Sequence, residues 1–169
     1  NRVAYGGHPP AGDARAAQMI VDADRLLARG RRAAAERALR GAVGAFERRG
    51  DVRRAGEAGL RLGRLLLGRG RAADASALFT DAHNRFQRAR AADGSLDATV
   101  YLGMAQTDRG QLIDAEQTCR TAYAAASALG NPDVVLFPAL ALARTLLWQK
   151  RHAEARSILE AVAPVGDVE

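Results

Sequence analysis

The chain has 169 residues, enough for one domain with a sizeable core. Hydrophobic residues make up 48 % of it but aromatic residues only 5 %, so Ala, Leu and Val must build most of the core, and the abundance of strong helix formers favours an all-α fold. The single cysteine, Cys119, excludes an internal disulfide and indicates a reducing, cytoplasmic location. The most apolar stretch, 134–148, is too short to span a membrane and contains Pro138 and Arg144, so no membrane partner is expected.

The net charge of +6 is unevenly distributed. Residues 1–90 carry 19 Arg and 9 acidic residues, whereas 91–169 carry 6 basic and 10 acidic residues. A basic half of this kind forms either a solvated surface or a contact surface for nucleic acid or another acidic partner. Its aromatic residues Phe46, Phe79 and Phe86 have the spacing of a helical core rather than of a base-stacking set, which disfavours nucleic acid.

In chain order, residues 1–12 contain Gly and Pro and indicate a linker, and turn signals then recur at equal intervals along the chain. Gly30, Gly50, Gly70, Gly110 and Gly130 mark these positions, while position 90 is Arg and position 150 is Lys. A glycine can adopt the left-handed conformation that ends a helix. Each interval therefore predicts one helix.

Two such helices form the repeating unit. Ala35, Ala75, Ala115 and Ala155 occupy one register position in this unit, five residues after a stop. Small residues, among them Gly63 and Gly103, allow the two helices of a pair to approach closely, as in an antiparallel helical hairpin. We expect Ala75 and Ala115 to be buried at this approach.

The pattern formed by Leu62-Gly63, Gly70, Ala75, Phe79 and Ala82 resembles the tetratricopeptide repeat (TPR). The resemblance implies a right-handed superhelix of about four antiparallel helix pairs, with repeats at 13–50, 51–91, 92–130 and 131–164 and the start of a further helix at 165–169. The repeat here, at about 40 residues, is longer than the usual one of about 34. It is similar to the repeat regions of large bacterial signal-transduction and transcription regulators.

The sequence offers no recognisable catalytic or metal-binding motif. The only lysine, Lys150, is not part of a phosphate-binding loop, and His8, His83 and His152 are too far apart in sequence for a ligand pair. Cys119 shares a register position with Leu39 and Phe79 and is expected to be a buried small hydrophobe. We therefore expect neither an enzyme nor a cofactor.

In TPR proteins the first helix of each pair lines a concave groove. The resemblance places candidate partner-binding residues at equivalent positions of these first helices, with two arginines two repeats apart: Ile20, Leu60, Arg64, Leu67, Val100, Met104, Phe137, Leu140, Arg144 and Trp148. This set is unusually apolar for a solvent-facing surface. The chaperone-binding members of the family clamp a carboxylate with Lys and Asn, which are absent from these positions.

The predicted function is a non-catalytic scaffold that binds a protein or peptide, within a larger bacterial regulator. Neighbouring domains of a parent chain, or a second copy of this one joined through the apolar groove or an array end, could also cover the groove. Two alternatives remain: a regulatory domain that senses a small ligand, and nucleic-acid binding through the Arg-rich half.

Overall fold

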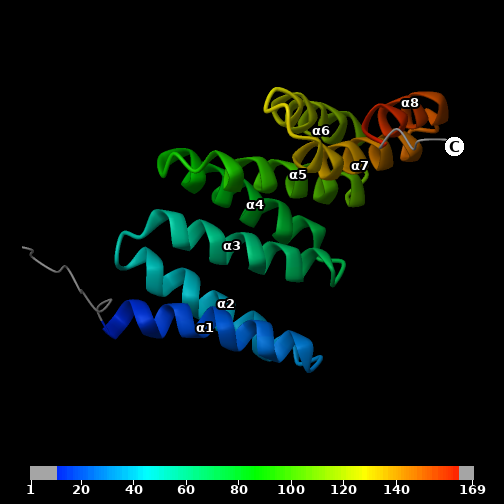
Figure 1. Ribbon diagram of the computed structural model, residues 1–169. Helices are drawn as coiled ribbons and strands as arrows, with labels where there is room; N and C mark the ends of the chain where they lie inside the picture. Colours follow the sequence, from blue (N-terminus) through cyan, green and yellow to red (C-terminus); the bar gives the residue numbers. More distant parts are fainter. Residues whose placement is uncertain (1–10, 164–169) are drawn as a thin grey trace, which may run out of the picture.

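The computed structural model describes residues 11–163, and side chains from residue 14 onward. The α-helices in this range, shown in Figure 1, are α1 (Ala11–Ala28), α2 (Arg32–Glu47), α3 (Val52–Leu67), α4 (Ala72–Arg88), α5 (Ala92–Asp108), α6 (Leu112–Ser127), α7 (Pro132–Trp148) and α8 (His152–Val162). Helix α1 begins inside the segment 1–12 that was expected to be a linker. The rest of that segment, with His8, and the segment 165–169 lie outside the described residues.

The helices pack as successive antiparallel pairs in an all-α repeat superhelix, as predicted (Figure 1). Each helix packs against its neighbours in sequence, and α5 also contacts α3 and α7. The first helices α3, α5 and α7 therefore lie side by side. Within residues 11–163, no helix combines the length and the apolar character that crossing a membrane requires.

The regularly spaced helix stops are confirmed by the backbone. All five glycines have positive φ, from +64° at Gly130 to +74° at Gly70 and Gly110. At Gly70 the amide of Arg71 donates to the carbonyl of Leu66 at 3.0 Å and that of Gly70 to Leu67 at 2.9 Å, which is the Schellman pattern. The same left-handed stop occurs without glycine at Arg90 (φ 53°) and Lys150 (φ 64°).

The register of the repeat is also confirmed, because the four register alanines are at most 1 % exposed. The close approach within a pair depends on the glycines of the first helices. A Cβ atom on Gly63 would lie 2.5 Å from the ring of Phe79, and one on Gly103 would lie 2.4 Å from Cys119 Sγ. Cys119 is fully buried, as expected.

The second helices are tied to one another by ion pairs rather than by close backbone packing. Glu36 on α2 accepts hydrogen bonds from Arg40 at 2.7 Å and from Arg71, at the start of α4, at 3.0 Å. Two repeats later, Glu116 on α6 pairs with Arg120 and with Arg151, at the start of α8. The hydrogen bond from Arg40, opposed by burial and aided by Arg71, lowers the pKa of Glu36.

Candidate peptide-binding surface

Helices α1, α3, α5 and α7 present a continuous surface, called here the first-helix face. Polar and aromatic contacts join each of these helices to the next. Arg61 on α3 donates to Asp24 on α1 at 2.8 Å, and Arg144 on α7 pairs with Asp108 on α5. The face is therefore laterally fixed by its own side chains.

An aromatic cluster lies on this face at Tyr101 of α5. The Tyr101 ring stacks on Phe79 with centroids 5.4 Å apart and contacts Phe137 of α7 at 5.1 Å with the rings tilted by 58°. The guanidinium carbon of Arg64, on α3, lies 5.1 Å from the Tyr101 centroid, within the range of a cation–π interaction. Because Phe79 is fully buried beneath half-buried Tyr101 and Phe137, the cluster is supported from below and reaches solvent above.

The Arg64 side chain is available to form an ion pair with a partner molecule. Its side chain is exposed and makes no ion pair within the described range. It lines a cleft of about 330 Å³ between α3 and α5, together with Leu60, Asp93 and Asp97. Partial enclosure raises the pKa of Asp97, with Asp93 adding to this effect and Arg64 opposing it. The cleft thus combines an available cation with a carboxylate that is easier to protonate than usual.

Several of the sequence-predicted groove residues contribute to packing. Val100 is 1 % exposed and packs with Cys119 and Leu142, so it cannot touch a partner in this conformation. Half-buried residues pack against the core clusters at their edges, namely Ile20, Leu60, Leu67, Met104 and Phe137.

The remaining predicted residues fall into two groups. Arg64 lies over the Tyr101 ring of the aromatic cluster, whereas Arg144 is engaged by Asp108. Leu140 and Trp148 are 48 % and 64 % exposed on α7, at the end of the described helix stack. The structure therefore joins Arg64 and Phe137 through Tyr101 and packs Met104 and Phe137 against one core cluster, while Leu140 lies one turn from Phe137 and Arg144 on α7 and Trp148 lies at the C-terminal end of that helix.

Sequence reasoning missed Tyr101, the centre of the cluster. Its register equivalents are Val21, Arg61 and Ala141, so the position has no aromatic pattern along the repeats. The available signal was its spacing: Tyr101 lies three residues before Met104, which places both on one side of a helix.

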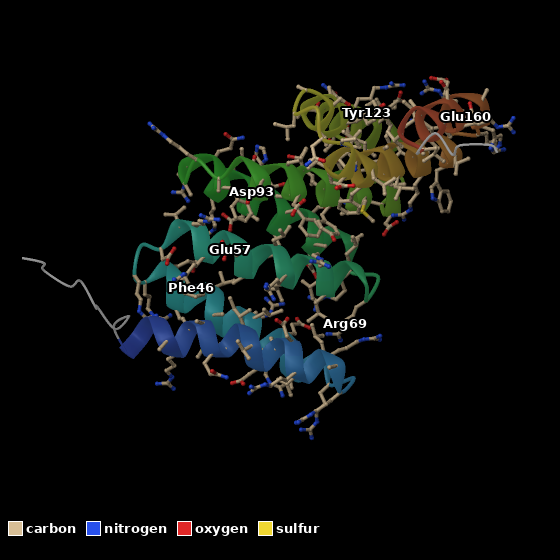
Figure 2. All side chains as sticks on the ribbon, viewed as in Figure 1. Phe46, Glu57, Arg69, Asp93, Tyr123 and Glu160 are labelled. Atoms are coloured by element: carbon tan, nitrogen blue, oxygen red, sulfur yellow. The ribbon has the colours of Figure 1, made fainter. Side chains whose placement is uncertain are left out.

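Several arginines of the basic half form ion pairs within the molecule. Arg69, which is labelled in Figure 2, and Arg71 pair with Glu36. Arg85 pairs with Glu47 at 2.5 Å and with Asp81 at 2.6 Å. Such pairing reduces the positive charge available for phosphate contacts.

A histidine and a serine meet in the part of the chain that is described, without the features of a catalytic site. His83 Nδ1 lies 3.1 Å from both Ser95 Oγ and Thr99 Oγ1. Ser95 is 6 % exposed within α5, and its hydroxyl oxygen also accepts a hydrogen bond from Gln87 at 2.9 Å. No carboxylate is hydrogen-bonded to the His83 ring within residues 14–163, so the pair lacks the group that orients a catalytic base.

Metal coordination has no basis in this part of the chain: residues 14–163 contain no group of three or more His, Cys, Asp or Glu that could hold an ion. Burial raises the pKa of the Cys119 thiol, against a weaker opposing hydrogen bond from Thr145. A thiol of raised pKa is a poor nucleophile and a poor metal ligand.

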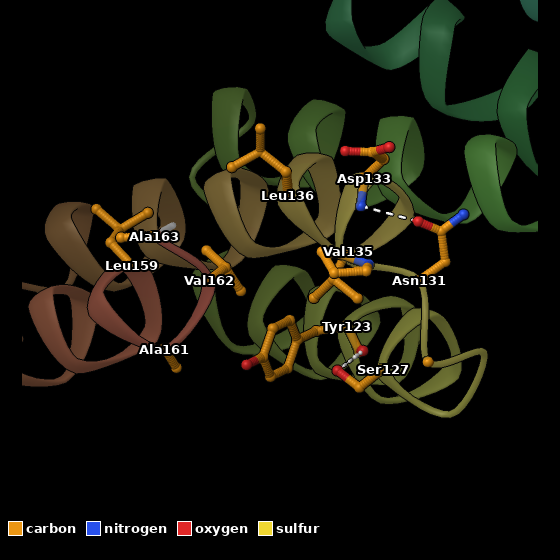
Figure 3. A pocket seen from close by; sticks show the side chains of 12 residues that line it. Tyr123, Ser127, Asn131, Asp133, Val135, Leu136, Leu159, Ala161, Val162 and Ala163 are labelled. Atoms are coloured by element: carbon orange, nitrogen blue, oxygen red, sulfur yellow. Dashed lines mark hydrogen bonds between the residues drawn. The ribbon is translucent and has the colours of Figure 1, made fainter. Parts of the chain in front are cut away.

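A larger pocket, which we call the terminal pocket, lies at the N-terminal end of α7. It has a volume of about 750 Å³ and is lined by residues of α6, α7 and α8, including Tyr123, Val135, Leu136, Leu159 and Val162. Figure 3 shows these apolar side chains around the opening, with Asn131 and Ser127 at one side. Asn131 Oδ1 accepts from the Asp133 amide at 3.0 Å and caps α7.

Solved structures with the same fold are TPR-like repeat proteins. BtubC (BKLC) from P. vanneervenii is 13 % identical with a TM-score of 0.80, covering 93 % of this chain and 65 % of its own. A putative kinesin light chain from Podosopora anserina, with nearly identical TPR-like repeats, is 19 % identical with a TM-score of 0.74, covering 95 % of this chain and 77 % of its own. No family model matches the sequence, and no match was found among curated proteins. The chain is therefore a TPR-like repeat domain by fold and spans about two thirds of the length of BtubC.

Proposed function

We propose that this chain is a non-catalytic scaffold that binds a protein segment on the first-helix face. The observation that carries the proposal is the aromatic cluster of Tyr101, Phe79 and Phe137 with Arg64 stacked over it. Aromatic and arginine side chains held in a fixed geometry are the usual energetic centres of protein interfaces. TPR-like repeat folds provide extended surfaces of this type.

The ligand chemistry follows from the residues available. A partner would place an apolar side chain against Tyr101 and Phe137 and a carboxylate near Arg64, which has no ion-pair partner in residues 14–163. An acidic, amphipathic helix or extended peptide meets both requirements. We further propose that the domain works in the cytoplasm as the interaction region of a larger regulator, in keeping with its long repeats.

The test uses a matched pair of charge reversals. An array of short peptides combining Asp or Glu with Leu, Phe or Trp is screened, and fluorescence anisotropy gives the affinity of the strongest peptide. Arg64→Glu should weaken that binding by at least about tenfold, since it replaces an attraction by a repulsion. Arg156→Glu makes the same charge change at an exposed position on α8 and should leave it unchanged. Equal affinity for the two variants, or no binding peptide in the array, would contradict the proposal.

A further inference from the structure

The groove where α2, α3 and α4 meet is filled by an arginine. Arg85 of α4 packs against Gly56 of α3, and its side chain is 13 % exposed. Its guanidinium pairs with Glu47 of α2 at 2.5 Å and with Asp81 of α4 at 2.6 Å. This side chain therefore occupies the groove and connects α4 to α2.

The equivalent groove one repeat later, where α4, α5 and α6 meet, is open. The position of the arginine is taken there by Ala125, whose side chain is too short to fill the same space. A cleft of about 530 Å³ results, called here the junction cleft, with apolar walls that include Phe86, Leu96 and Ala122. It shares only Phe86 and Ala91 with the cleft beside Arg64, so it is a separate site on α5.

The charge of the groove changes between these two repeats. Gln87 and Thr121, which are neutral, stand in the junction cleft at the positions of the two carboxylates that hold Arg85. No aspartate or glutamate is among the described residues that line this cleft, whereas Arg90 is. Arg90 is exposed and makes no ion pair among the residues that the structure describes. The groove that holds a cation in one repeat therefore favours an anion in the next.

His83 adds a hydrogen-bond acceptor to the same cleft. Thr99 Oγ1 donates its hydrogen to the Ser95 carbonyl at 2.8 Å, so it can only accept from His83 Nδ1, which lies 3.1 Å away. This contact assigns the hydrogen of the neutral imidazole to Nδ1. Nε2 then carries a lone pair, and it has no hydrogen-bond partner in residues 14–163.

We propose that the junction cleft binds a small aromatic carboxylic acid that has a hydroxyl or N–H donor on its ring. The carboxylate would pair with Arg90, the donor would bind His83 Nε2, and the ring would lie against Phe86. Clefts with apolar walls and a few polar groups are the usual sites for small molecules. A cationic ligand, which would resemble the arginine of the preceding groove, would meet no carboxylate among the described lining residues.

The spacing of the two polar groups limits the shape of the ligand. His83 and Arg90 are seven positions apart, which corresponds to about 10 Å along a helix. The donor and the carboxylate must therefore lie at opposite ends of the ring, as they do in para-hydroxyphenylpropionate. A ligand in this position would contact α4, α5 and α6 and so connect the second helix pair to the third.

Ligand-detected NMR with para-hydroxyphenylpropionate tests the ligand class. A molecule of about twelve non-hydrogen atoms should bind with a dissociation constant of about 1 mM or lower. Phenylpropionate lacks the hydroxyl and para-propylphenol lacks the carboxylate, so each should bind at least about tenfold more weakly. Absence of binding by para-hydroxyphenylpropionate, or equal affinities for the three molecules, would overturn the proposal.

Two matched pairs of variants test the position of the site. Ala125→Arg restores the side chain that fills the preceding groove and should abolish binding. Ala124→Arg makes the same change at an exposed neighbour that does not line the cleft, and should leave binding unchanged. Circular dichroism verifies that both variants keep their helicity.

The second pair removes the cation. Arg90→Gly should weaken binding at least about tenfold because the carboxylate loses its partner. Lys150→Gly makes a comparable change at the other left-handed stop without glycine and should have no effect on binding. Since glycine suits the backbone at both positions, a loss confined to Arg90→Gly cannot result from unfolding. Binding that survives either Ala125→Arg or Arg90→Gly would overturn the proposal.

Discussion

Substitution of Gly63 by alanine should destabilise the protein, although alanine is the better helix former. The added Cβ would lie 2.5 Å from Phe79 Cε1, 2.9 Å from Cδ1 and 3.0 Å from Cζ. The ring has no free space in which to move, because Phe79 is fully buried and stacks on Tyr101. The methyl group must therefore push α3 and α4 apart or force the ring from its preferred rotamer.

The magnitude follows from two opposing terms and a control in the same helix. Overpacking costs about 1–3 kcal/mol, and replacing a helical Gly by Ala gains about 1 kcal/mol, so Gly63→Ala should lose up to about 2 kcal/mol. Gly59 is also buried in α3, but a Cβ there meets nothing within 4 Å. Gly59→Ala should therefore gain about 1 kcal/mol. Because the chemical change and the helix are the same, the difference between the variants isolates the contact with Phe79.

Urea unfolding followed by circular dichroism measures these free energies of unfolding. Adding Phe79→Leu to both backgrounds completes a double-mutant cycle, and Gly63→Ala should cost less in the Leu background because the clashing ring is absent. If Gly63→Ala proves as stable as Gly59→Ala, the close approach of α3 and α4 at this glycine is wrong.

Two other predictions concern the turns and the ion pairs. Arg90→Gly and Lys150→Gly should each raise the free energy of unfolding by about 0.5–1 kcal/mol, since both residues have positive φ and only glycine adopts it without strain; lower thermal midpoints for both would contradict this. Because the fold lowers the pKa of Glu36, its contribution to stability is present at neutral pH and is lost as the pH falls below about 4.3 and through the folded pKa. Urea unfolding measures the free energy of unfolding that each variant loses between pH 7 and pH 4. This loss should be smaller for Glu36→Gln than for Glu160→Gln, and equal losses would exclude this role of Glu36.

The repeat architecture was predictable because it is set by local chemistry that recurs. A glycine that ends a helix and an alanine five residues later are visible in the sequence, and the structure confirms both. At Arg90 and Lys150 the backbone takes the same left-handed turn although the sequence has no glycine at these positions. The hydrogen bonds that close the helix form at both stops as well, from the Ala91 amide to the Phe86 carbonyl and from the Arg151 amide to the Leu146 carbonyl, each at 2.9 Å.

The candidate surface was less predictable because equivalent positions have different neighbours. Leu60, Val100 and Leu140 share one register position, yet they are half-buried, buried and exposed in turn. The sequence pattern of one repeat does not show whether a neighbouring helix covers a given position. Gln106 departs from the repeat pattern, because it replaces the leucine found at positions 26, 66 and 146. Its side-chain oxygen is buried without a hydrogen-bond partner in the described part of the chain.

The ion pairs between second helices also affect where a partner would act on the stack. Glu36 ties α2 to α4 and Glu116 ties α6 to α8, but the intermediate position is Ser76, and no ion pair joins α4 to α6 within the described range. The junction between the second and third pairs therefore depends on other contacts, among them Phe79 of α4 against Tyr101 of α5. A ligand held by Arg64, Tyr101 and Phe137 would contact three successive pairs and bridge this junction. Its binding energy would then add to the stability of the one interface between second helices in residues 11–163 that lacks such a tie, so the aromatic cluster is the place where occupancy should affect the whole stack most strongly.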